Sequence, residues 1–94
     1  SELLLLKHTD FPAYSCGLHP WYLRADQYAE DWDKCRLAAH LPQIWAIGET
    51  GLDRAINIPF DWQKKVFTKH IVLSETVGKP LIIHCVRAYP DVLQ

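Results

Sequence analysis

Three residues of types that bind divalent metal ions occur at matching places in the chain: His19, Glu49 and His84. Each comes directly after a short, largely apolar run, namely 13–18, 44–48 and 81–83. If these runs are parallel strands, their carboxyl ends meet at one edge of a sheet, and the three side chains converge there. Imidazole nitrogen together with carboxylate oxygen is a ligand set for Zn²⁺, Mn²⁺ and similar ions. The spacing therefore predicts a metal site at that edge.

Each of these residues also has a structural interpretation. A single His after a strand is more often a hydrogen-bonded structural residue than a ligand, and a Glu after a Gly can simply cap the next turn. Three such strand ends in succession favour the functional interpretation. The other histidines considered, His40 and His70, fall on predicted helices as surface or packing residues, and Cys85 is expected to be an inert, buried thiol.

The segment 44–53 organises the rest of the chain. Its first five residues, 44–48, form a continuous apolar run, which is typical of a strand that is buried on both faces and covered by helices on both sides. The run ends at Glu49, and Gly51 punctuates the loop expected after it. Glu49 is therefore expected at the carboxyl edge of the central strand, where α/β folds and barrels place their chemistry.

Helices are predicted between the strands. Apolar residues recur at helical spacing at positions 28, 32, 35 and 39, and again between 66 and 77. Pro59 suits the first turn of the second helix, Gly78 is a stop signal, and a further helix starts near Pro90. The order strand, helix, strand, helix, strand, start of helix implies right-handed crossovers and a parallel sheet.

The predicted fold class is α/β: residues 1–94 form a parallel βαβαβ segment of a TIM (β/α)8 barrel, incomplete at both ends and belonging to a single domain. The opening run Leu3–Leu6 reads equally well as the tail of a helix or as a short strand. Because a sheet taken from a barrel has two open edges, we expect the chain to self-associate through them.

Composition narrows the possible functions. The net charge of −1 gives no basic surface for non-specific binding of nucleic acid or membranes, although a metal ion can supply positive charge locally. No apolar run approaches the length of about 20 residues that a membrane-spanning helix needs. The three cysteines show no Cys-x-x-Cys spacing, which favours reduced, buried thiols and a cytoplasmic protein.

Three motifs, in this order, resemble those of the TatD family of metal-dependent hydrolases. They are Gly-Leu-His-Pro at 17–20, Ala-Ile-Gly-Glu-Thr-Gly-Leu-Asp at 46–53 and Pro-Leu-Ile-Ile-His-Cys at 80–85, and Gln63 and Phe67 also fit the family pattern. The resemblance covers most of residues 13–88, and Gly-Glu-Thr-Gly-Leu-Asp is its most specific part. It implies a TIM-barrel enzyme that acts as a divalent-metal phosphodiesterase, typically a deoxyribonuclease, on DNA or another phosphodiester.

Carried over by position, the resemblance implies a role for each of the three residues. Glu49 is similar to the metal-bridging carboxylate and His84 to a metal-ligating imidazole. The ions implied are Mg²⁺, Mn²⁺ or Zn²⁺, one or two in the complete enzyme. His19 is similar to a catalytic residue on the substrate side, near the scissile phosphate.

Two further residues are defined less sharply by the resemblance. Asp53 corresponds to a catalytic residue that supports the metal ligands, although a loop cap is an equally good interpretation of an Asp at this place. Arg87 is a substrate-binding candidate for phosphate, but the family usually places its basic residue one position earlier, where Val86 stands.

Part of the family's ligand set has no counterpart in this sequence. The missing groups are a His-x-His pair on the first strand, a later His and a late Asp that would activate water. We therefore expect the chain alone to carry only part of the metal site and to be a poor catalyst unless another chain completes it. Two alternatives stay open: an amidohydrolase-like hydrolase of a small molecule, and a non-catalytic assembly fragment.

Overall fold

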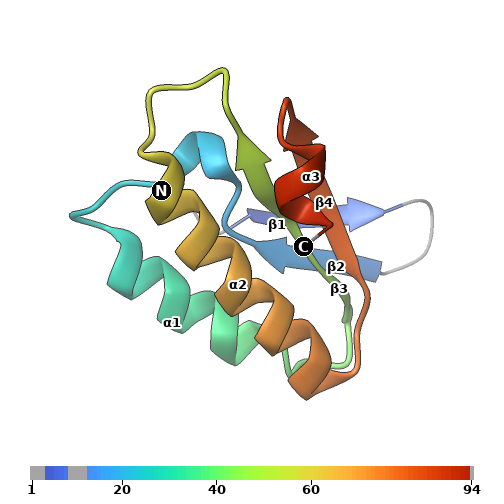
Figure 1. Ribbon diagram of the computed structural model, residues 1–94. Coiled ribbons are helices and arrows are strands. Elements are labelled where there is room, and N and C mark those ends of the chain that lie inside the picture. The colour runs from blue at the N-terminus through green and yellow to red at the C-terminus, as the bar shows by residue number, and fades with distance from the viewer. Residues whose placement is uncertain (1–3, 9–12, 94) are drawn as a thin grey trace.

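The computed structural model describes residues 4–8 and 13–93, which form a four-stranded sheet with helices packed against it (Figure 1). The strands are β1 (Leu4–His8), β2 (Ala13–Gly17), β3 (Ile44–Asp53) and β4 (Leu81–Val86), and they lie side by side in this order. β2, β3 and β4 are parallel, as predicted, whereas β1 pairs with β2 in antiparallel fashion. The undecided opening run is therefore a strand from Leu4 onward, and Leu3 lies outside the described residues.

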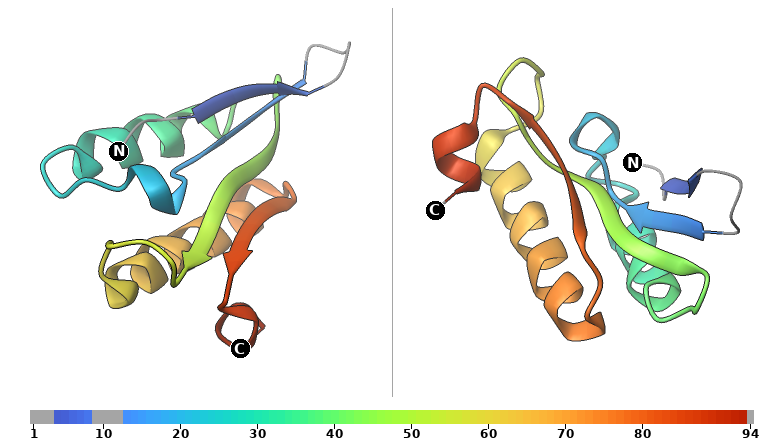
Figure 2. Two further views of the ribbon diagram at one scale, coloured as in Figure 1. Left: turned by 90° about the horizontal axis from the view of Figure 1, so that it is seen from above. Right: turned by 90° about the vertical axis from the view of Figure 1, so that its right-hand side faces the viewer.

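The helices are α1 (Tyr28–Ala38), α2 (Phe60–Val77), α3 (Tyr89–Val92) and the short 3-10 helix η1 (Pro20–Tyr22). α1 and α2 lie on the same side of the sheet, as the two views in Figure 2 show. The expectation of helices on both faces of the central strand is therefore wrong for the described part of the chain. A barrel keeps its helices in an outer ring, and the one-sided layer fits a segment of such a barrel. Among the described residues, the helices lack the length and apolar character needed to cross a membrane.

The main core lies between the sheet and the two long helices. Its buried members include Cys16 from β2, Cys35 from α1 and Leu73 from α2. Two of the thiols are thus buried as predicted, whereas Cys85 is only partly buried. The apolar run 81–83 predicts a third buried strand, but β4 forms one edge of the described sheet and its Ile83 is 43% exposed.

Strand β3 is longer than predicted and contains two bulges. Its pairing with β2 passes over Trp45, and its pairing with β4 passes over Glu49. We expected the strand to end at Gly48, but its pairing with β4 continues to Asp53. A bulge leaves one residue out of the ladder and re-aims its side chain. Glu49 is therefore presented by a bulge inside the strand and not by a loop after it.

Gly51 and Gly78 both have positive φ, at 151° and 67°, but their surroundings differ. A Cβ on Gly51 would overlap the carbonyl oxygen of His84, whereas a Cβ on Gly78, at the end of α2, would meet nothing. We expect Gly78→Ala to lower the free energy of unfolding by about 1–2 kcal/mol, the cost of the left-handed conformation alone. Gly51→Ala should lower it by about 3 kcal/mol or more, because the overlap forces β3 and β4 apart. Urea unfolding of both variants measures the difference, and equal losses would contradict this account of the β3–β4 pairing.

Candidate metal centre

His19, Glu49 and His84 converge on one side of the sheet's carboxyl edge. One imidazole nitrogen from each His and one carboxylate oxygen all lie within 4.8 Å of one another. His19 follows β2 as the N-cap of η1, Glu49 is the residue at the β3 bulge, and His84 lies in β4 opposite Gly51. We expected Glu49 and His84 directly after their strands, but both lie within them. The structure brings together the three residues whose spacing predicted a metal site, while their binding of metal stays a prediction.

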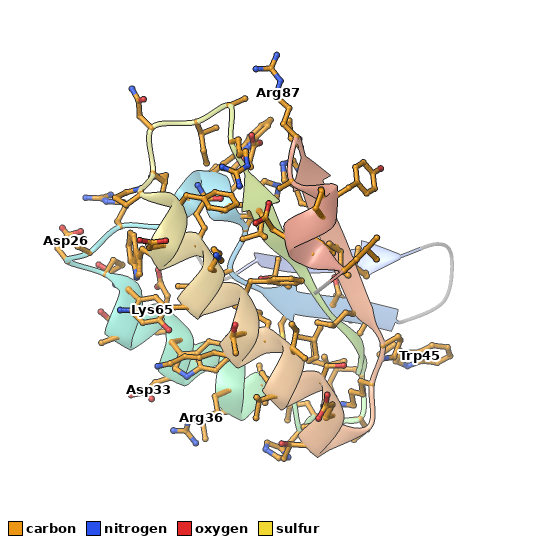
Figure 3. All side chains as sticks on the ribbon, in the orientation of Figure 1. Asp26, Asp33, Arg36, Trp45, Lys65 and Arg87 are labelled. Carbon is orange, nitrogen blue, oxygen red and sulfur yellow. The ribbon has the colours of Figure 1, made fainter. Side chains whose placement is uncertain are left out.

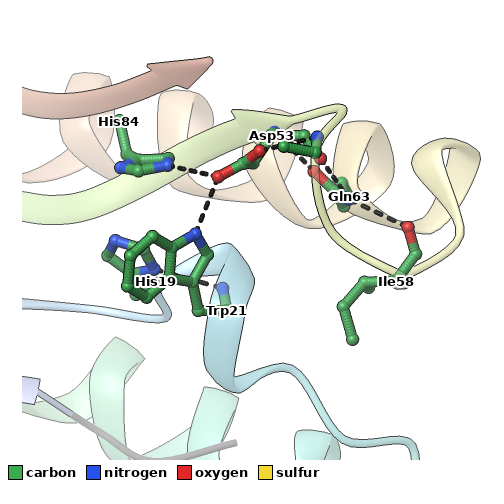
Figure 4. Close-up of polar contacts among 7 residues, drawn as sticks. His19, Trp21, Asp53, Ile58, Gln63 and His84 are labelled. Atoms are coloured by element: carbon green, nitrogen blue, oxygen red, sulfur yellow. Dashed lines mark hydrogen bonds and ion pairs between the residues drawn. The ribbon is translucent and has the colours of Figure 1, made fainter.

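The ring of His84 is oriented by Asp53. Nε2 of His84 lies 2.8 Å from Oδ2 of Asp53 (Figure 4). Because an ionised carboxylate only accepts hydrogen bonds, Nε2 carries the proton. The lone pair of the neutral ring is then on Nδ1, which is free to bind a metal ion. A His whose second nitrogen donates to a carboxylate is the usual arrangement of a metal-ligating His.

Asp53 accepts three hydrogen bonds although it is only 2% exposed. Oδ2 accepts from the indole Nε1 of Trp21 at 2.7 Å as well as from His84, and Oδ1 accepts from the backbone N–H of Ala55 at 2.8 Å. Burial alone would raise the pKa of this carboxyl, but the hydrogen bonds from Trp21, His84 and Ala55 outweigh burial and lower the pKa below its ordinary value. Asp53 thus caps the loop and orients His84 at the same time.

His19 is expected to offer an N–H donor to a ligand, whereas His84 offers the lone pair of Nδ1. Its Nδ1 accepts a hydrogen bond from the backbone N–H of Trp21 at 3.1 Å, so the neutral ring carries its proton on Nε2. Burial and the neighbouring His84 lower the pKa of His19. Glu49 and Asp53 act in the opposite direction but more weakly, so the pKa stays below its ordinary value. A neutral His19 with an N–H donor is suited to an anionic oxygen of a ligand.

Comparison with known proteins agrees with this geometry. The family model described as TatD related DNase matches residues 2–94. The chain belongs to this family. It is 35% identical over 96 residues to the human 3'-5' RNA nuclease TATDN2, covering 99% of this chain and 12% of the relative. It is 34% identical over 85 residues to the 3'-5' ssDNA/RNA exonuclease TatD of Rahnella sp. (84% of this chain, 30% of the relative).

A third relative is named only for its reaction type. The uncharacterized metal-dependent hydrolase YabD of Bacillus subtilis is 39% identical over 92 residues, covering 95% of this chain and 35% of the relative. The chain thus spans about a third or less of the length of these curated relatives.

The residues of this TatD-family chain fit a divalent ion. Ligand atoms about 2.0–2.2 Å from a shared ion lie up to roughly 4 Å from one another, so a set within 4.8 Å needs only a small closing movement. The free Nδ1 of His84 and the carboxylate of Glu49 are the donors that would hold it. The imidazole nitrogen of this donor set suits Zn²⁺, and its carboxylate oxygen suits Mg²⁺ or Mn²⁺.

The remaining site candidate, Arg87, and the two histidines expected to be surface or packing residues are not part of this cluster. Arg87 has a positive φ of 54°, and its exposed side chain points away from the body of the molecule (Figure 3). His40 was expected within a helix, but it lies exposed in the turn after α1. His70 is fully buried in α2, which agrees with a packing role.

Two residues that support the site were not identified as such from the sequence. No role was predicted for Trp21 from the sequence, and its position directly after His-Pro was the signal that could have placed it beside His19. Gln63 was noted only for fitting the family pattern. Its Oε1 accepts from the backbone N–H of Asp53 at 2.7 Å, and its Nε2 donates to the carbonyls of Asp53 and Ile58 at 3.1 and 2.9 Å (Figure 4).

This arrangement predicts the effect of changing Gln63 to its acid. In Gln63→Glu a carboxylate oxygen would face the carbonyls of Asp53 and Ile58, which lose their donor in a site that is 1% exposed. We expect a loss of about 3 kcal/mol or more in the free energy of unfolding, measured by urea denaturation at neutral pH. Gln43→Glu, at an exposed position before β3, is the matched control and should change stability little. Equal effects at the two positions would contradict the role given to the hydrogen bonds of Gln63 with Asp53 and Ile58.

Proposed function

We propose that this chain forms part of the active site of a metal-dependent phosphodiesterase that acts on DNA or another nucleic acid. Glu49 and His84 hold the metal ion, and His19 donates a hydrogen bond from Nε2 to the phosphate. Membership of the TatD-related family and the nuclease names of two relatives support the reaction class. The observation that carries the proposal is the convergence of Glu49, His19 and His84, with the backbone of Trp21 bonded to Nδ1 of His19 and Asp53 bonded to Nε2 of His84.

The chemistry divides between the ion and the side chains. An ion held by Glu49 and His84 would supply Lewis-acid chemistry for the phosphodiester and would lower the pKa of a bound water. Asp53 keeps the Nδ1 lone pair of His84 available and holds the ring in place. His19 orients the phosphate through the N–H of its Nε2, because its Nδ1 is occupied by the backbone N–H of Trp21.

The other ligands are proposed to come from outside this chain, because it has no counterpart of the family's His-x-His pair, later His and late Asp. The free thiols Cys16 and Cys35, whose sulfur atoms lie 3.9 Å apart, support a reducing, cytoplasmic compartment for the protein.

The test is hydrolysis by the full-length protein. An end-labelled single-stranded oligonucleotide is incubated with Mg²⁺, Mn²⁺ or Zn²⁺, and in parallel with EDTA. We expect stepwise shortening that depends on the metal and stops with EDTA. Carboxylic esters and amides are assayed beside it. Hydrolysis of these with no cleavage of the oligonucleotide would replace the proposal with the amidohydrolase-like alternative, and inactivity on every substrate would reject it.

A further inference from the structure

Two aromatic side chains stand exposed beside the candidate metal centre. Trp21 is 54% and Tyr22 is 42% exposed. Both belong to η1, and their ring centroids lie 5.2 and 5.5 Å from that of His19. The Trp21 ring also lies 5.6 Å from the ring of His84. Large rings next to a polar centre leave apolar surface facing water, so their placement calls for a ligand with an apolar face.

The Trp21 ring is fixed before any ligand binds. Its indole N–H donates to Asp53 at 2.7 Å, and its backbone N–H donates to His19. The backbone N–H of Tyr22 donates to the carbonyl of His19 at 3.0 Å. A ring held in this way loses little conformational entropy when a ligand stacks on it. These contacts fix the two rings relative to His19, which is proposed to bind phosphate, and to Asp53, which orients His84.

We propose that Trp21 and Tyr22 form a stacking platform for the nucleobase attached to the phosphate that His19 binds. The inference rests on the proposed function and specifies its substrate: an unpaired end of a nucleic acid, whose base is free to leave its neighbours. Every base has a π-face, so the platform accepts all sequences. Bases in a duplex are already stacked and paired and reach the rings only after unpairing.

Charge supports stacking as the source of affinity. Nucleic-acid binding proteins that rely on the phosphate backbone carry basic stripes and lose affinity steeply with salt. This chain has a net charge of −1, and the carboxylates of Asp53 and Glu49 lie close to the platform, Asp53 in direct contact with Trp21. A base held by aromatic rings supplies attraction that does not depend on surface charge. Small phosphodiesters without a base therefore lack the part of the substrate that the platform recognises.

The experiment compares two substrates for the full-length protein with Mn²⁺: a single-stranded dT oligonucleotide and an abasic oligonucleotide of the same length. Both offer the same phosphodiester bonds. We expect kcat/KM to be about 5- to 150-fold lower for the abasic strand, the range of one stacked base. Trp21→Ala and Tyr22→Ala should each lower the ratio of the two kcat/KM values, whereas Trp21→Phe, which keeps a stacking face but loses the indole N–H that fixes the ring, should lower it less than Trp21→Ala. Trp45→Ala, at the exposed bulge at the other end of β3, is the matched control.

The outcomes separate the two proposals. If the wild-type protein cleaves both strands equally well, the platform is rejected while the proposed function stands. If neither strand is cleaved, the proposed function fails and the platform with it. A ratio that survives in the Trp21→Ala/Tyr22→Ala double variant, with circular dichroism showing that it is folded, also rejects the platform. Fluorescence polarisation of labelled dT in EDTA gives a second readout without catalysis, and there the double variant should bind at least about fivefold more weakly.

Discussion

Glu49→Gln in the full-length protein is expected to lower metal-dependent hydrolysis about 10³-fold or more. The substitution keeps the size of the side chain and removes the negative charge that the bulge in β3 places beside His84. Charge stabilisation by a bound ion is worth several kcal/mol, and each loss of about 1.4 kcal/mol is a factor of ten in rate. The effect should therefore be large even if the fold is unchanged.

The measurement has two parts. Initial rates on an oligonucleotide give the loss of activity, and calorimetry with Mn²⁺ or Zn²⁺ gives the loss of metal affinity independently of turnover. Asp53→Asn should cost less, about 10- to 100-fold, because Asp53 acts through His84. Glu75→Gln, on the exposed side of α2, is the matched control and should behave like wild type. Full activity in Glu49→Gln, or unchanged metal affinity, would remove Glu49 from the metal site.

The sequence predicts those features of the candidate site that depend on short, continuous runs of residues. Apolar runs followed directly by His or Glu indicate strand ends, and the parallel order brings strand ends to one edge. That reasoning placed His19, Glu49 and His84 together, and the structure brings them within reach of one another. It could not place the bulges, because a bulge depends on how two strands pair and not on either strand alone. Glu49 was therefore expected after its strand and not inside it.

The supporting contacts were out of reach for the same reason. Trp21 and Asp53 are 32 positions apart, and only the path of the chain brings the indole to the carboxylate. The one-sided helical layer was also missed. A continuous apolar run looks the same in sequence whether its second face meets helices or faces the interior of a barrel. The uncertain opening run had too few residues to show either a helical or a strand period, and its pairing with β2 makes it a strand.

A second large effect is expected at His70, a fully buried residue of α2 that contacts the backbone next to His19. Its Nε2 accepts a hydrogen bond from the backbone N–H of Leu18 at 2.9 Å, and its Nδ1 lies 2.8 Å from the carbonyl of Val66. The neutral ring with its proton on Nδ1 satisfies both partners. A second proton on Nε2 would face the N–H of Leu18, directly before His19. α2 thus holds the backbone of the site through one unprotonated nitrogen.

This geometry makes stability depend on pH. Burial lowers the pKa of His70 to about 4, and the hydrogen bond to Val66 offsets only part of that effect. In the unfolded chain the pKa of this side chain is about 6.5. Between about pH 4 and 6.5 His70 is therefore protonated in the unfolded state and neutral in the folded state. The contribution of His70 is complete above about pH 6.5 and is lost as the pH falls toward 4, by about 3 kcal/mol in total.

His70→Gln should flatten the pH profile of stability, because its amide oxygen can accept from Leu18 and does not titrate. Urea unfolding of wild type and variant at several pH values between 4 and 7, in EDTA to exclude metal binding, measures the difference. Wild type should lose about 3 kcal/mol more than the variant across this window, and the difference cancels the contributions that both share. His40→Gln, in the exposed turn after α1, should follow the wild-type profile. Parallel profiles for wild type and His70→Gln would show that His70 is not held neutral by its buried contacts.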